Sequence, residues 1–135
     1  VGPSNVVAIL GDLSSNKKLP YKSISMIDGD HEAAKCLKLP GTVAPERVVF
    51  EGLKNKGWDN LDNRFGIGAG TLYKYLDDAM LLPDHHDWTT YVGDKVKKSK
   101  DTVWVILTEE WCKQCLNDEV RKNIINVIKK ELKTI

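Results

Sequence analysis

The chain has 135 residues, of which 41% are hydrophobic and 29% are charged, and its formal net charge is +1. This composition is typical of one compact soluble domain and excludes a low-complexity or disordered chain. No apolar run is long enough to cross a bilayer, so we expect no membrane partner. The small net charge does not by itself indicate nucleic-acid binding, because dedicated nucleic-acid binders are usually much more basic.

Apolar spacing and turn residues predict the elements of the first half. We expect a helix over Ser4–Leu13 and a short buried strand over Ile24–Ile27, which runs straight into Asp28-Gly29-Asp30. A short helix is predicted over His31–Leu39, where a proline and a glycine end it. A further helix begins at about Pro45, because proline suits the first helical turn.

The second half is predicted to be helical. Gly66–Gly70 is a glycine-rich turn before a helix over Thr71–Leu82, and Asp84 can cap the helix that follows. The start of Asp101–Leu116 is β-branched enough for a strand, yet its apolar residues also share one helical face. We favour a helix there, with a break near residues 117 and 118. The expected fold class is therefore α/β, with helix dominant.

The clearest chemical feature is the pair Asp28 and Asp30. Residues two apart in a strand point to the same side, so both carboxylates can face one point at the carboxyl end of the strand. Gly29 between them permits a sharp turn and close approach of an ion or phosphate. Hard cations such as Mg²⁺ prefer such oxygen ligands. From these residues alone, an ordinary Asp-Gly-Asp turn is the simpler interpretation.

A longer pattern favours a functional site over an ordinary turn. The strand and Asp28-Gly29-Asp30, then Leu39-Pro40-Gly41, then Ala44-Pro45-Glu46 together resemble the TOPRIM domain of OLD-family (overcoming-lysogenisation-defect) ATP-dependent endonucleases. The resemblance covers roughly residues 1–56. It implies that residues 1–60 form the C-terminal part of a Rossmann-like TOPRIM domain with a small parallel sheet. Residues 61–135 would be a mainly helical tail packed on it.

The resemblance also implies a function. Asp28 and Asp30 would be the metal ligands, Glu46 a third ligand, and one or two Mg²⁺ or Mn²⁺ ions would support phosphodiester hydrolysis of DNA. The family's glutamate-bearing strand and ATPase domain would lie before Val1, so ATP would act only through a domain outside this chain. The implied role is DNA processing or defence against phage, and a homo-oligomer is compatible with it.

Basic side chains near the scissile phosphate would complete such a site. Lys95 and Lys97 are the candidates for a catalytic lysine, and His31, Lys98 and Lys100 are weaker candidates for DNA contact. A solvated helix face is the ordinary alternative for such a lysine cluster.

Two alternatives from other classes remain open. Trp111-Cys112-Lys113-Gln114-Cys115 is similar to the motif of thioredoxin-like oxidoreductases, which need the first thiol at a helix amino terminus. In a helix, these cysteines would instead pack as small apolar residues. A non-catalytic regulatory or assembly domain is the other alternative. The three cysteines in the chain and the absence of a signal peptide favour a reducing, cytoplasmic location.

The remaining motifs are weaker. His85 and His86, with Asp84 and Asp87, could bind a transition metal, but adjacent helical residues point apart and more ligands would be needed. A surface or capping role is the expected one. The four tryptophans are expected to be core anchors, although Trp58 in a loop could stack on a base.

Overall fold

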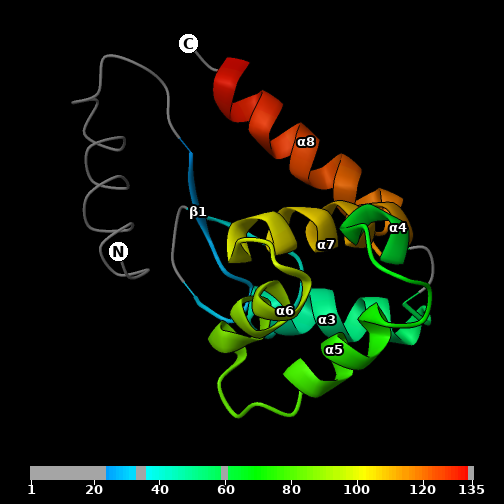
Figure 1. Cartoon of the computed structure of the whole chain (residues 1–135). Coiled ribbons are helices and arrows are strands. Elements are labelled where there is room, and N and C mark those ends of the chain that lie inside the picture. Colours follow the sequence, from blue (N-terminus) through cyan, green and yellow to red (C-terminus); the bar gives the residue numbers. More distant parts are fainter. Residues whose placement is uncertain (1–23, 33–35, 59–60, 134–135) are drawn as a thin grey trace. The chain divides into compact units, whose positions relative to one another are not determined.

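The structure, a computed structural model, describes residues 24–32, 36–58 and 61–133 (Figure 1). The chain forms two compact units. The first comprises Val1–Pro45 and Asn117–Ile135, and the second comprises Glu46–Leu116. The helix predicted over Ser4–Leu13 lies outside the described residues. The expected boundary after residue 60, between a TOPRIM part and a helical tail, stays a prediction.

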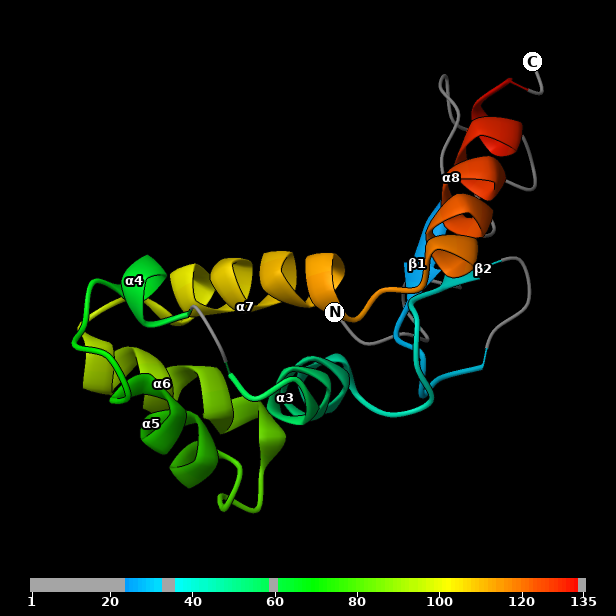
Figure 2. The same ribbon diagram turned by 90° about the vertical axis from the view of Figure 1, so that its right-hand side faces the viewer.

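A two-stranded parallel sheet lies in the first unit (Figure 2). Strand β1 (Ser25–Ile27) pairs with β2 (Cys36–Lys38), and Ser25 lies opposite Cys36. Ser25 and Ile27 are buried while Met26 between them is exposed, which is the alternation of a strand with one face covered. The strand predicted over Ile24–Ile27 is confirmed. The chain is therefore a mixed α/β protein.

The helix predicted over His31–Leu39 is wrong for residues 36–38, because these residues form β2. Their backbone groups pair with β1, and the Leu39 amide then donates a hydrogen bond to the Ile27 carbonyl oxygen at 2.9 Å. An apolar segment this short has too few side chains for their spacing to distinguish a helix from a strand. The neighbouring strand decided the outcome.

Helix α8 (Asp118–Lys133) belongs to the first unit. The Asn117 side-chain oxygen accepts a hydrogen bond from the Glu119 amide at 2.7 Å and caps the helix, so the predicted break before residue 118 is confirmed. None of the α8 side chains that the structure describes is buried. Among the described residues, no helix combines the length and apolar character that a membrane span needs.

The second unit is a helical bundle in which α6 contacts both α5 and α7 (Figures 1 and 2). Its elements are α3 (Pro45–Asn55), α4 (Asp62–Phe65), α5 (Leu72–Ala79), the short 3-10 helix η2 (His85–Asp87), α6 (Trp88–Val96) and α7 (Lys100–Gln114). The predicted helices therefore form, and the segment from residue 101 is helical rather than extended. Ser99 caps α7 by accepting a hydrogen bond from the Thr102 amide.

Aromatic rings organise the core of this bundle. Phe50 on α3 packs between Trp58 and Trp88, with ring centroids 6.2 Å and 5.2 Å away. The Trp58 indole is buried and donates a hydrogen bond to the Asp77 carboxylate at 3.2 Å. Trp58 is thus confirmed as a core anchor, and its ring is not free to stack on a base. Aliphatic side chains from every long helix of the unit complete the core: Leu53, Leu72, Leu76, Val92, Val103 and Leu107.

The glycine-rich turn is held by a carboxylate from the preceding helix. Asp62 accepts hydrogen bonds from the backbone amides of Gly70 at 3.2 Å and Leu72 at 3.0 Å. Thr71, at the start of α5, makes no side-chain cap of its own. Asp62 therefore satisfies two backbone amides at the amino end of α5.

Candidate functional site

The predicted pair of aspartates lies at the carboxyl end of β1. The Asp28 carbonyl oxygen accepts a hydrogen bond from the His31 amide at 3.1 Å, which closes a turn over residues 28–31. Ligand atoms of Asp28, Asp30 and His31 all lie within 4.8 Å of one another. The turn therefore brings two carboxylates and an imidazole to one place on the surface of the first unit.

Gly29 fixes this turn against the second part of the sequence motif. A β-carbon on Gly29 would lie 2.3 Å from the Gly41 carbonyl oxygen and 2.8 Å from that of Leu39. Real side chains do not approach backbone atoms so closely, so only glycine is accommodated here. The Asp-Gly-Asp and Leu-Pro-Gly segments are thus in direct contact.

The donor set of this cluster suits a hard divalent cation. Two carboxylates and a few waters or substrate oxygens are a common Mg²⁺ environment, and an imidazole is tolerated by Mn²⁺. Oδ1 of Asp30 lies 3.7 Å from Nε2 of His31, which is an ion-pair distance when the imidazole is protonated. Within the described part of the chain, no lysine or arginine forms an ion pair with Asp28 or Asp30. Their negative charge is therefore not neutralised by any lysine or arginine that the structure describes.

Glu46, the predicted third ligand, belongs to the second unit. It lies in the first turn of α3, and its Oε2 is 3.9 Å from Nε2 of His85. Among the described residues, His85 is the only one within ion-pair distance of Glu46, and the pair is charged only when His85 is protonated. A role for Glu46 beside Asp28 and Asp30 stays a prediction from the resemblance.

The basic candidates other than His31 also belong to the second unit. Lys95 lies over the Tyr91 ring, with Nζ 5.4 Å from the ring centroid, which is a cation–π contact. Lys97 ends α6 in the left-handed conformation, and Lys98 follows it in an exposed turn. Lys100 begins α7 and lines a cavity. A catalytic lysine therefore also stays a prediction.

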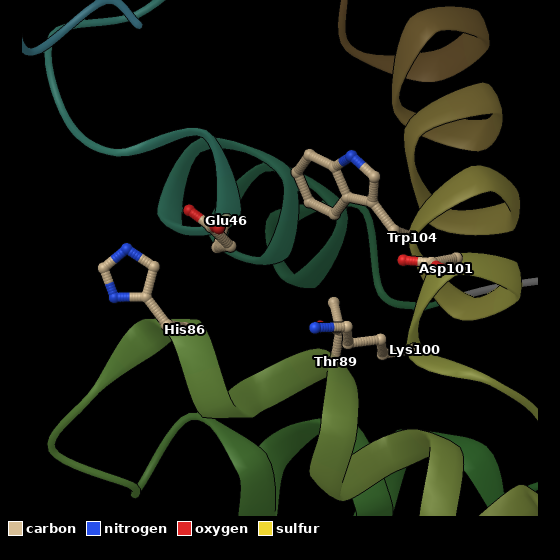
Figure 3. A pocket seen from close by; sticks show the side chains of 6 residues that line it. All are labelled: Glu46, His86, Thr89, Lys100, Asp101 and Trp104. Atoms are coloured by element: carbon tan, nitrogen blue, oxygen red, sulfur yellow. The ribbon is translucent and has the colours of Figure 1, made fainter. Parts of the chain in front are cut away.

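This cavity, of about 270 Å³, lies between the first turns of α3 and α7 and the start of α6 (Figure 3). One of its walls is the Thr89 side chain, which is 8% exposed. The Thr89 hydroxyl makes no hydrogen bond to any residue that the structure describes. Sequence reasoning did not find this cavity, because its six lining residues come from separate segments: Glu46, His86, Thr89, Lys100, Asp101 and Trp104.

A second group of ligand-type side chains lies at the edge of this cavity. Ligand atoms of Asp84, His85 and His86 lie within 4.8 Å of one another. The Asp84 carboxylate accepts a hydrogen bond from the His86 amide and is 2.7 Å from Nδ1 of the His86 ring. The backbone hydrogen bond lowers the pKa of Asp84, and the side-chain hydrogen bond to Asp84 raises the pKa of His86. The predicted capping role of Asp84 is confirmed.

The cysteines occupy the wrong end of a helix for redox catalysis. Cys112 lies in the last turn of α7, and Cys115 follows its final residue. Thiolates are stabilised at the amino end of a helix, where the dipole is positive, and not at the carboxyl end. Burial raises the pKa of Cys115 further. This geometry favours the structural interpretation of both cysteines over the oxidoreductase alternative.

Comparisons of the chain with protein-family models, with curated proteins and with solved structures find no match.

Proposed function

We propose that this chain provides the two-aspartate part of the metal site of a DNA endonuclease. The observation that supports the proposal most directly is the convergence of Asp28 and Asp30 at the carboxyl end of a strand in a parallel sheet. The packing of Gly29 on Leu39 and Gly41 adds support, because it explains why the two parts of the motif occur together.

Each residue of the turn has a distinct role in this proposal. Asp28 and Asp30 supply oxygen ligands to the ion, and Gly29 lets the turn that carries them pack against the backbone of Leu39 and Gly41. His31, which is half-exposed, can donate a hydrogen bond to a phosphate oxygen when protonated. When bound, Mg²⁺ or Mn²⁺ would supply an activated water and stabilise the leaving oxygen.

The finer assignments belong to the same proposal. Residues 1–60 would be the C-terminal part of a TOPRIM domain of the OLD type, which acts on DNA in the cytoplasm. An ATPase domain elsewhere in the same protein would regulate cleavage, with DNA processing or defence against phage as the role. The resemblance of the Asp28–Glu46 segment supports these assignments.

The first experiment measures Mn²⁺ binding by electron paramagnetic resonance. We expect the wild-type chain to bind Mn²⁺ and the double variant Asp28→Asn, Asp30→Asn to lose this binding. The matched control is Asp118→Asn with Glu119→Gln, which removes two adjacent carboxylates from the same unit without touching the turn. Mn²⁺ binding that is equal in all three proteins, or absent from the wild type at millimolar Mn²⁺, would overturn the proposal in favour of a non-catalytic module.

The second experiment measures nicking of supercoiled plasmid by the full-length protein with Mn²⁺. The Asp28→Asn, Asp30→Asn change should reduce the nicking rate by about 100-fold or more. A bound metal stabilises the charge that develops in the transition state by several kcal/mol, and this stabilisation would be lost. The control pair on α8 should cleave as the wild type does. Cleavage that survives the Asp28→Asn, Asp30→Asn change would show that another site hydrolyses the DNA.

A further inference from the structure

The group at η2 differs in chemistry from the aspartate pair. It contains two imidazoles, His85 and His86, whereas the turn at Asp28 is mainly carboxylate. Imidazole ligands favour Zn²⁺, Co²⁺, Ni²⁺ and Cu²⁺, while carboxylate and water oxygens favour Mg²⁺. The two groups are therefore expected to select different ions.

The structure answers both objections that the sequence raises to a metal site here. Although they are adjacent in sequence, His85 and His86 have ring centroids 4.1 Å apart and an interplanar angle of 34°, so both rings lie on the same side of the short helix. The additional ligand comes from far along the chain, because Glu46 on α3 lies beside His85. All these residues are within the second unit.

The separation of Glu46 and His85 suits a bridging ion better than a hydrogen bond. Their Oε2 and Nε2 atoms are 3.9 Å apart, which is too long for a hydrogen bond. Two donors that bind one zinc ion at about 2.0–2.1 Å lie roughly 3.3 Å apart at a tetrahedral angle, and at most about 4.2 Å apart. A small rotation of either side chain therefore brings both atoms to one ion.

The surroundings of His86 and His85 hold the two rings in place. Asp84 is bonded to Nδ1 of His86, which leaves Nε2 as the ring nitrogen available to a metal. Carboxylates that orient a ligand histidine in this way are a regular part of metal sites. The Trp88 and His85 rings are nearly perpendicular, with centroids 6.4 Å apart, and Trp88 is itself anchored through its Nε1 to the Leu82 carbonyl oxygen.

The charges and the cavity around this group favour a bound cation with an open position. The negative charges of Asp84, Glu46 and Asp87 attract a positive charge at His86. Asp101 lines the same cavity, and among the described residues Lys100 is the only cation in its lining. Figure 3 shows Glu46 and His86 at the same end of the cavity. The buried Thr89 hydroxyl lines the same cavity and makes no hydrogen bond with a described residue.

We propose that His85, His86 and Glu46 bind one transition-metal dication of the Zn²⁺ type, with Asp84 orienting His86. Two histidines and one glutamate are a known zinc ligand set, and three protein ligands leave a position for water or another small oxygen donor. The ion joins η2 to the first turn of α3. This assigns Glu46 to an ion other than the one bound by Asp28 and Asp30.

The test is titration of the chain with Co²⁺, followed by visible absorption, with Zn²⁺ as competitor. We expect one equivalent of Co²⁺ to give a ligand-field spectrum that Zn²⁺ abolishes. The variant His85→Ala, His86→Ala should lose this spectrum, Glu46→Gln should weaken Co²⁺ binding at least about tenfold, and Asp84→Asn should weaken it about 10- to 100-fold. Circular dichroism confirms that each variant is folded.

Matched controls separate this site from the nuclease proposal. His31→Ala removes an imidazole from the other group, and Asp28→Asn with Asp30→Asn removes its carboxylates; both should leave the Co²⁺ spectrum unchanged. A spectrum that disappears in these variants, or persists in His85→Ala, His86→Ala, would overturn the inference. Because the Mn²⁺ measurement probes the aspartate pair, failure of one proposal does not affect the other.

Discussion

The carbonyl oxygen of Gly41 lies 2.3 Å from the position that a β-carbon on residue 29 would occupy. Gly29 separates the two aspartates, and Gly41 ends the Leu-Pro-Gly segment that follows β2. This contact packs together two segments that the sequence alone indicates only as two separate turns. It also means that the geometry of the aspartate pair depends on a residue with no functional group.

Gly29→Ala should therefore disrupt the sheet as well as the turn. The added methyl must push backbone aside, which we expect to cost about 1–3 kcal/mol. The Leu39 amide, which is bonded to the Ile27 carbonyl oxygen, should lose hydrogen-exchange protection by roughly tenfold to a hundredfold. Gly68→Ala is the control, because among the described residues its β-carbon would meet the Thr71 hydroxyl alone, at an ordinary contact distance of 3.8 Å. Undiminished protection of Leu39 in Gly29→Ala would contradict the packing.

Asp62→Ala should loosen the glycine-rich turn and the start of α5. The substitution leaves the amides of Gly70 and Leu72 without their carboxylate acceptor, which we expect to cost about 1–2 kcal/mol. Urea unfolding monitored by circular dichroism measures the loss. Asp94→Ala, at an exposed position of α6, should change the free energy of unfolding by less than about 0.5 kcal/mol. Equal effects of the two substitutions would argue against the capping role of Asp62.

Arg64 makes Glu109 a pH-dependent contributor to stability. The hydrogen bond from the Arg64 guanidinium holds the pKa of Glu109 below its ordinary value of 4.5. Since the folded-state pKa is lowered, the contribution is present above pH 4.5 and is lost as the pH falls through the folded-state pKa. Arg64→Gln should return the Glu109 pKa toward 4.5 in a carboxyl NMR titration. Lys113→Gln removes a weaker charge interaction and should change the Glu109 pKa less than Arg64→Gln does. A larger change in the Glu109 pKa from Lys113→Gln than from Arg64→Gln would refute the role of Arg64.

Cys115 should react slowly with iodoacetamide in the folded protein. Burial raises its pKa, so less thiolate is present at any pH near neutrality, and alkylation should become fast only at higher pH than for an exposed cysteine. Mass spectrometry of the alkylated peptide, with the protein in urea as the control, gives the rate. Rapid alkylation of folded Cys115 at pH 7 would revive the oxidoreductase alternative for the Cys112–Cys115 pair.

Local chemistry made much of this protein predictable. The strand before Asp28, the proline-initiated helix at Pro45 and the cap at Asp84 each depend on residues close in sequence, so their spacing alone indicated them. Asp28 and Asp30 were expected to converge as alternate residues of a strand; the strand instead ends at Ile27, and the turn that follows it places their carboxylates close together.

Tertiary structure alone decided the other features. The segment Cys36–Lys38 became a strand because β1 offered its backbone hydrogen-bond partners, which a short apolar run cannot reveal. The contact between Glu46 and His85 depends on packing between α3 and η2, elements separated by 39 positions in sequence at these residues. No local propensity encodes such a distance, because it is the burial of Phe50, Leu53 and Trp88 in one core that brings the two polar groups together.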